Sequence, residues 1–181
     1  MSLTEGPNAC GTGSNYNDGG DIAWTYPANV QVDNSDYAHA MVSNTTPSTQ
    51  ALYAKNFGFT IPTNAIITNV TFSYKRRCSL ARITEKNVVM CDSSGNPTGI
   101  DKADVITTWG TTTETITKSG DSDYWGMPLT PALVNDADFG LKISASLITG
   151  SSDIAFVLYI SCTVTYVFPS GARAQLIGPI W

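Results

Sequence analysis

The fold of this chain is decided by residues 154–168, which read IAFVLYISCTVTYVF. Apolar side chains recur there at every second position, which is the pattern of a β-strand. The inward-facing set expected from this alternation is Phe156, Leu158, Ile160, Cys162, Val164, Tyr166 and Phe168. The opposite side also carries apolar groups (Val157, Tyr159 and Val167), so we predict a long strand in the middle of a sheet.

The same alternation recurs along much of the chain, between segments that break strands. Clear patterns cover residues 51–60, 66–75 and 139–148, and weaker ones cover 36–42, 83–91 and 114–118. Clusters of Gly, Pro, Asn and Asp lie between these patterns and favour turns. Helical structure is expected only as one short turn at 131–135. The predicted fold is therefore all-β, an antiparallel two-sheet sandwich that is jelly-roll-like and has about eight strands.

Three regions are expected along the chain. Residues 1–20 include Gly11, Gly13, Gly19 and Gly20 and few large apolar groups, which predicts an extended N-terminal arm or loop. Residues 21–168 are expected to form the β-sandwich domain, and residues 169–181 a C-terminal tail. The tail ends with four large apolar residues: Leu176, Ile177, Ile180 and Trp181. Exposed groups of this size mark contact sites, so we predict an interface with a neighbouring subunit there, with folding back over the sandwich as the alternative.

Charge and segment length argue against nucleic acid and membranes as partners. Charged residues make up 14% of the chain, and the net charge is −5. Binding to nucleic acid needs a basic face, and the cluster around Lys75 and Arg77 is better explained as a solvated strand end. Residues 154–168 are fewer than the ~20 residues of a membrane helix, and the first residues do not read as a signal peptide. We therefore expect no nucleic acid and no membrane as partner.

Catalytic and redox chemistry have little support in the sequence. The four cysteines match no zinc or redox spacing and are expected to be free thiols. His39 is the only histidine, and no Gly-x-Ser-x-Gly motif accompanies it. We predict that the protein is not an enzyme, that it needs no cofactor, and that His39→Ala leaves its activity intact.

Two weaker candidate sites come from loops. Asn15, Asn17, Asp18 and Asp21 supply oxygen atoms within one glycine-bent loop, as calcium prefers, but such loops are common without a metal and none is predicted. The aromatic residues Trp24, Trp109, Tyr124 and Trp125 lie in or beside expected loops. They offer rings on which a sugar could stack, although the interpretation that they cover the ends of the core is favoured.

Several local motifs together resemble a known family. They are LYAKNFGFTIP at 52–62, AIITNVTF at 65–72, DYWGMPLT at 123–130, DFGLKI at 138–143 and VTY at 164–166. This set resembles the jelly-roll domains of tailed-bacteriophage virion proteins, such as capsid decoration proteins, head fibres and tail-associated modules. The resemblance spans residues 21–168, and each motif also makes structural sense on its own.

The resemblance implies a structural, non-catalytic virion protein. Its expected role is that of a capsid decoration protein, which docks on the major capsid protein or on neighbouring subunits. The expected state is a homo-oligomer such as a trimer, and the expected location is the virion, assembled in the host cytoplasm. The alternative function is a carbohydrate-binding or host-receptor-binding module that uses the loop aromatics.

Overall fold

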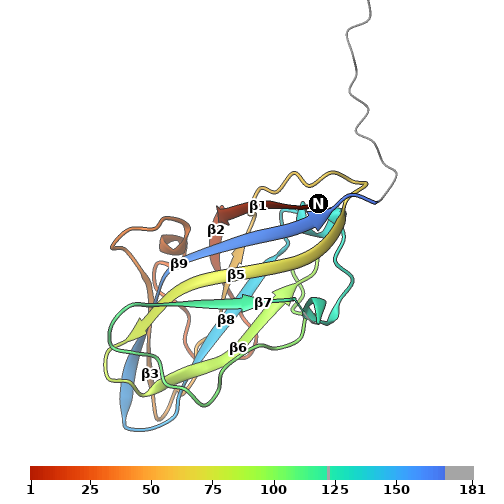
Figure 1. Cartoon of the computed structure of the whole chain (residues 1–181). Coiled ribbons are helices and arrows are strands. Elements are labelled where there is room, and N and C mark those ends of the chain that lie inside the picture. Colours follow the sequence, from red (N-terminus) through yellow and green to blue (C-terminus); the bar gives the residue numbers. More distant parts are fainter. Residues whose placement is uncertain (122, 170–181) are drawn as a thin grey trace, which may run out of the picture.

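The computed structural model describes residues 1–121 and 123–169, which form two antiparallel sheets packed face to face (Figure 1). Within these residues the strands are β1 (Ser2–Ala9), β2 (Thr12–Tyr16), β3 (Ala38–Ser43), β4 (Ala51–Lys55), β5 (Ile66–Cys78), β6 (Ile83–Cys91), β7 (Glu114–Ser119), β8 (Gly140–Leu147) and β9 (Ser152–Val167). The helical segments are η1 (Pro27–Gln31), η2 (Tyr124–Gly126) and α1 (Pro131–Val134). The predicted all-β sandwich is confirmed, with nine strands among the described residues.

The long strand β9 organises the larger sheet. The order in this five-stranded sheet is β1-β9-β5-β7, and β3 also pairs with β9. The first half of β9 pairs with β3 and the second half with β1, while β5 runs along its other edge. The four-stranded sheet has the order β2-β4-β8-β6. The prediction that residues 154–168 form a central strand is therefore confirmed.

The core lies between the two sheets and is rich in aromatic rings. Phe72 on β5 is fully buried, with its ring centroid 5.6 Å from Phe57, 5.5 Å from Trp125 and 5.8 Å from Phe139. On β8 the alternate residues Leu141, Ile143 and Ala145 are buried as predicted. These aromatic contacts join β5 to the loops on both sides of it, so the core holds loops as well as strands.

A β-bulge interrupts the alternation of β9. Lys75 on β5 pairs with Tyr159, but the next residue of β5, Arg76, pairs with Val157. Leu158 is therefore an extra residue on β9, and a bulge of this kind reverses which face the following residues point to.

The bulge corrects part of the predicted inward set. Before it, Ala155 and Val157 lie in the core, and Phe156 points to the outer face of the sheet. After it, Ile160, Cys162 and Val164 are in the core as predicted. The predicted inward positions of Phe156 and Leu158 were wrong. Because this strand carries apolar residues on both faces, its sequence does not reveal where the bulge shifts the alternation between inward and outward residues. Phe168 was also misplaced, since it lies beyond the strand and is exposed.

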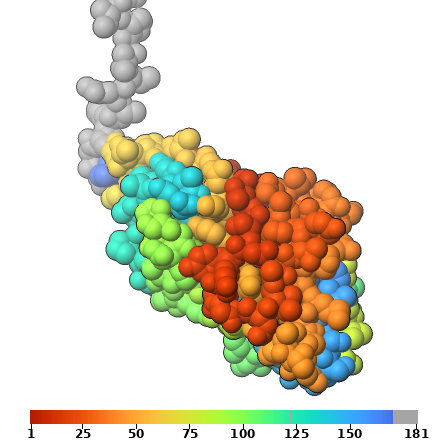
Figure 2. Space-filling view, turned by 180° about the vertical axis from the view of Figure 1, so that it is seen from behind, coloured from red at the N-terminus to blue at the C-terminus, as the bar shows by residue number. Residues whose placement is uncertain are grey.

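The prediction of an N-terminal arm over residues 1–20 was also wrong. Instead, β1 pairs with β9 and β2 pairs with β4, so both sheets gain an edge strand from this segment. Figure 2 shows these residues, coloured red, forming a large part of one face of the molecule. The glycines that suggested an arm permit close packing instead: a β-carbon at Gly13 would lie 2.2 Å from the Pro27 carbonyl oxygen.

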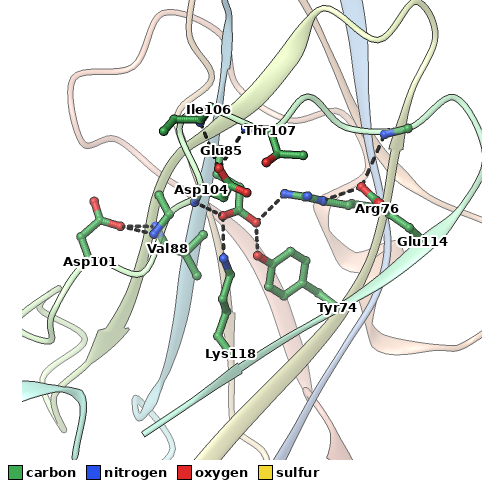
Figure 3. A network of polar contacts seen from close by, with 12 residues as sticks. Tyr74, Arg76, Glu85, Val88, Asp101, Asp104, Ile106, Thr107, Glu114 and Lys118 are labelled. Atoms are coloured by element: carbon green, nitrogen blue, oxygen red, sulfur yellow. Dashed lines mark hydrogen bonds and ion pairs between the residues drawn. The ribbon is translucent and has the colours of Figure 1, made fainter. Parts of the chain in front are cut away.

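A buried polar network joins the second sheet to a long loop (Figure 3). The carboxylate of Glu85 on β6 accepts from Arg76 Nη1 at 2.5 Å, from Lys118 Nζ at 3.0 Å and from the Tyr74 hydroxyl. It also accepts from the backbone N–H of Asp104 at 2.6 Å. These bonds hold the loop between β6 and β7 against β5 and β7.

The remaining predictions about the chain concern cysteines and the membrane. The four cysteines are free and buried, as predicted, and Cys78 and Cys91 end strands of different sheets. In the part of the chain that the structure describes, no helix combines the length and the apolar character needed to cross a bilayer.

Candidate functional site

The three tryptophans proposed for sugar stacking lie in the core. Trp24, Trp109 and Trp125 are buried, and the indole N–H groups of Trp24 and Trp125 donate to the Gln50 and Val70 carbonyls at 2.8 and 2.9 Å. Their faces are covered by protein, so stacking on these three residues was the wrong interpretation, and their role in the core was the right one. Tyr124 is half exposed.

The loop proposed as a weak calcium candidate uses its oxygens for its own structure. Asn15 Oδ1 accepts from the Trp24 N–H at 2.7 Å, and Asp21 Oδ2 accepts from the Ser48 N–H and hydroxyl, both at 3.0 Å. Asn17 Oδ1 accepts from the Gly19 N–H and Asp18 Oδ1 from the Ala51 N–H, both at 3.2 Å. Across residues 1–121 and 123–169 no group of three or more His, Cys, Asp or Glu gathers to hold a metal.

The predicted interface residues Leu176, Ile177, Ile180 and Trp181 lie outside the described residues. That prediction stays a prediction.

The structure brings together a different set of residues, which we call the aromatic pocket. It has a volume of 390 Å³ and is lined by Tyr26, Asn29, Ser35, Asp36, Tyr37 and His39. The lining comes from η1, from the loop that follows it and from the start of β3. Every lining side chain is either an aromatic ring or a short polar group.

Next to the aromatic pocket, a row of side chains is paired across three strands. His39 on β3 lies opposite Phe156 on β9, which in turn lies opposite Arg77 on β5. Because the bulge turns Phe156 outward, its ring meets Tyr37 edge-on at 4.9 Å, and the Arg77 guanidinium lies 3.9 Å from its centroid. The site therefore depends on the same bulge that interrupts the core pattern.

Tyr26 forms the exposed wall of the aromatic pocket. Its backbone is left-handed (φ 54°, ψ 51°), a region that side-chain-bearing residues enter rarely and at an energetic cost. Its side chain is 65% exposed, and its ring centroid is 5.9 Å from His39. The ring centroid of Tyr37 is 5.7 Å from that of His39. His39 thus contacts two tyrosine rings.

Hydrogen bonds fix the polar residues of the loop. The Asn29 amide donates to the Tyr37 carbonyl at 3.2 Å, and the Asp36 N–H donates to Asn34 Oδ1 at 2.8 Å. The same loop is tied to β5, since Asp33 pairs with Lys75 Nζ at 2.7 Å. A loop held in this way is organised before a ligand arrives, which lowers the entropic cost of binding.

The chemistry of the pocket suits binding. His39 contacts rings, and its Nδ1 is buried without a hydrogen-bond partner among the described residues. Among the described residues no hydrogen bond links the imidazole to a carboxylate or hydroxyl that it could activate. Sequence reasoning missed this site because it looked for tryptophans; the available signal was Tyr26 and Tyr37 on either side of the Pro27 turn, close to the only histidine.

Comparisons with known proteins give distant structural similarities. No family model matches the sequence, and no curated protein matches it. A structure described as "CBM4 structure and function" is similar at 13% identity and a TM-score of 0.40, covering 72% of this chain and 85% of the other. The N-terminal cellulose-binding domain of Cellulomonas fimi β-1,4-glucanase C is similar at 11% identity and a TM-score of 0.30, covering 68% and 86%.

The third structure belongs to a larger protein. It is the Clostridium thermocellum N-terminal endo-1,4-β-D-xylanase 10B with its CBM22-1 and GH10 modules, complexed with xylohexaose. Identity is 12% and the TM-score 0.30, covering 96% of this chain and 27% of the other. Likeness at these values transfers neither a ligand nor a site to this chain. None of these three structures is described as a virion protein, and the virion resemblance stays a prediction.

Proposed function

We propose that this chain is a non-catalytic carbohydrate-binding module that holds a sugar unit in the aromatic pocket. The observation that carries the proposal is the composition of the lining: three rings (Tyr26, Tyr37 and His39) beside three short polar groups (Asn29, Ser35 and Asp36). Small-molecule sites combine apolar surface with a few well-placed polar groups in this way.

The two kinds of side chain match the two kinds of sugar surface. A pyranose ring has faces of C–H groups, which pack on an aromatic face such as the exposed ring of Tyr26. Its hydroxyl groups both donate and accept, and the Asp36 carboxylate, Asn29 amide and Ser35 hydroxyl provide partners of both types.

The same lining argues against hydrolysis of the bound sugar. Glycoside hydrolysis uses two carboxylates about 5–10 Å apart across the scissile bond. Asp36 is the carboxylate among the residues that line the aromatic pocket. The pocket therefore offers a binding partner for a hydroxyl group without the second carboxylate of a hydrolytic pair. His39 contributes as a ring, so we now expect His39→Ala to weaken sugar binding, in contrast to the expectation from sequence.

Tyr26 and Tyr124 provide a matched test. Both tyrosines are exposed (65% and 50%), and both have a left-handed backbone (φ 54° and 49°). Of these two tyrosines Tyr26 lines the aromatic pocket, whereas Tyr124 lies in η2 and does not line it. The full chain is first screened on a glycan array, and its best ligand is titrated by calorimetry. We expect Tyr26→Ala to weaken binding roughly tenfold or more, as loss of about 1.4 kcal/mol of stacking implies.

Tyr124→Ala is the control for Tyr26→Ala. Tyr124→Ala should bind the same glycan as the unchanged chain does. Equal losses in the two variants, or no retained glycan on the array, would overturn the proposal. Unchanged binding in Tyr26→Ala would place the sugar elsewhere on the molecule.

As a second candidate function we propose a structural virion protein. Copies of the chain would associate through the loop between β6 and β7. This proposal is supported by an apolar tip: Ile106 is 84% exposed, and Val105 beside it is exposed too. The tip is rigid because Asp104 Oδ1 accepts from the Ile106 and Thr107 N–H groups at 3.0 and 2.9 Å. Bonds from the Thr107 hydroxyl and these N–H groups lower the pKa of Asp104 to about 2, so its carboxylate stays charged in the turn.

Sedimentation of the chain tests this candidate. We expect a homo-oligomer at about 0.1 mM that dissociates in Ile106→Ser, because the exposed isoleucine would supply buried area in the contact. A monomer at that concentration, or an oligomer unaffected by Ile106→Ser, would reject the loop as the contact.

A further inference from the structure

A second pocket lies on the outer face of the four-stranded sheet, and we call it the lysine pocket. It has a volume of 280 Å³ and is lined by Asp18, Ala51, Asn87, Val89, Pro97 and Lys142. Neighbouring residues on the same strands, such as Leu52 on β4 and Leu141 on β8, lie in the core. Alternation therefore places Ala51 and Lys142 on the side away from the core.

Lys142 is buried at this site. Its relative exposure is 3%, and its Nζ donates to the Gly95 carbonyl at 2.5 Å. The ammonium group lies 3.0 Å from the ring centroid of Tyr16 and 4.6 Å from that of Tyr53. These rings provide cation–π attraction, which is stronger for a desolvated cation.

A carboxylate partner is missing from this arrangement. In residues 1–121 and 123–169, Lys55, Lys75, Lys102 and Lys118 each form an ion pair with an Asp or Glu, whereas no ion pair includes Lys142. Burying an ammonium without a counter-charge is unfavourable. Burial lowers the pKa of Lys142, and the negative charges of Asp18 and Asp92 oppose this effect.

We propose that the lysine pocket binds a small carboxylate-bearing polyol of the hexuronic acid class, with its carboxylate on Lys142. The carboxylate supplies the counter-charge that Lys142 lacks. Hydroxyl groups of the ligand have the Asp18 carboxylate and the Asn87 amide as partners, and its C–H groups face Ala51, Val89 and Pro97. The proposal is independent of the aromatic pocket, which lies at η1 and β3.

The size and rigidity of the pocket limit the ligand. A volume of 280 Å³ is near the lower end, roughly 300 Å³, of small-molecule sites, so one sugar-sized unit fits. Asn87 is already oriented, since its amide N–H donates to Asp101 Oδ2 at 2.7 Å and its Oδ1 accepts from the Ser144 hydroxyl at 3.2 Å.

The lysine pocket contains one cation, Lys142, and one anion, Asp18. The burial of each group determines whether the pocket attracts an anion or a cation. Asp18 is exposed, and its Oδ1 already accepts from the N–H groups of Gly20 and Ala51 at 3.3 and 3.2 Å. Water and salt screen the charge of an exposed group. Lys142 is buried, where the same charge acts at a lower effective dielectric constant and attracts an anion more strongly.

A titration of the full chain compares glucuronate with glucose, which differ at the carboxylate position. Binding is followed through the amide resonances of Ala51, Asn87 and Val89. We expect glucuronate to shift these resonances and to bind about tenfold or more tightly than glucose. Absence of any shift at about 10 mM glucuronate, or equal binding of the two sugars, would overturn the proposal.

Two variants with opposite expected effects make the test sharper. Lys142→Met should weaken glucuronate binding about tenfold or more, while Asp18→Asn, which removes a repelling charge and keeps an acceptor, should strengthen it about twofold. Lys86→Met is the control, because Lys86 bonds to the Ser48 hydroxyl and does not line the pocket. The reverse order of effects would show that the pocket selects a cation. Loss of glycan binding in Tyr26→Ala would leave these results unaffected.

Discussion

At the scale of single residues, Glu85 shows how a buried charge is held. Its side chain is fully buried and pairs with Arg76 and Lys118, whereas Glu114, which also pairs with Arg76, is 37% exposed. Replacing Glu85 by Gln would leave two cations without their shared carboxylate. We expect Glu85→Gln to lower the free energy of unfolding by about 3–5 kcal/mol.

Urea denaturation measures this loss, with Glu114→Gln as the matched control. The control should lose under about 1 kcal/mol, because a half-exposed ion pair is screened by water. Similar losses in both variants would mean that burial does not set the strength of this network.

Phe72 is the corresponding test of the apolar core. It contacts three other rings, from Phe57, Trp125 and Phe139, at the centre of the sandwich. Truncation to Ala would leave a cavity among them, and we expect a loss of about 3–5 kcal/mol in the same urea experiment. A loss below about 1 kcal/mol would show that these rings repack around the missing side chain.

At the scale of elements, the first strand contributes more than its sequence suggests. Polar and small residues fill β1, so it has no clear apolar alternation, yet it pairs with β9 from Ser2 to Ala9. Removal of residues 1–9 would leave this edge of β9 without partners. We expect the shortened chain to have a lower melting temperature and to associate, because unpaired strand edges recruit other strands. An unchanged melting temperature in calorimetry would support the arm that the sequence predicted.

The sequence also missed β2, and β4 ends about five residues before the predicted pattern at 51–60 does. The strands β3 and β5 to β9 were predictable to within about three residues, because apolar side chains recur along them. Residues 83–91 were expected as a strand and form β6 with the same bounds, and the expected turn at 131–135 is α1. The aromatic pocket was not predictable in this way. It needs the extra residue Leu158 to turn Phe156 outward and a left-handed Tyr26, and both depend on tertiary contacts that no sequence period records.

At the scale of the whole molecule, buried cysteine thiols and a buried tyrosine hydroxyl make the free energy of unfolding depend on pH. Burial raises the pKa of Cys10 and of Cys91 to about 12, from an ordinary value of 9.0, and it also raises the pKa of Cys78, Cys162 and Tyr74. The folded chain therefore keeps protons that the unfolded chain releases above pH 9. Stability is lost with rising pH wherever the folded state holds more protons.

The pH window follows from these values. The stabilisation by neutral thiols is fully present below about pH 9 and is lost as the pH rises toward about 12. We expect the free energy of unfolding to fall steadily across this range. The variant with both Cys10→Ala and Cys91→Ala should show a shallower fall, because two of the groups that release protons on unfolding are gone. Tyrosine and lysine residues are present in both proteins, so the difference between the slopes reports the two thiols together with their coupling to Tyr53, Lys142 and Tyr159. Urea unfolding at several pH values gives both slopes, and identical slopes would contradict the burial of these two cysteines.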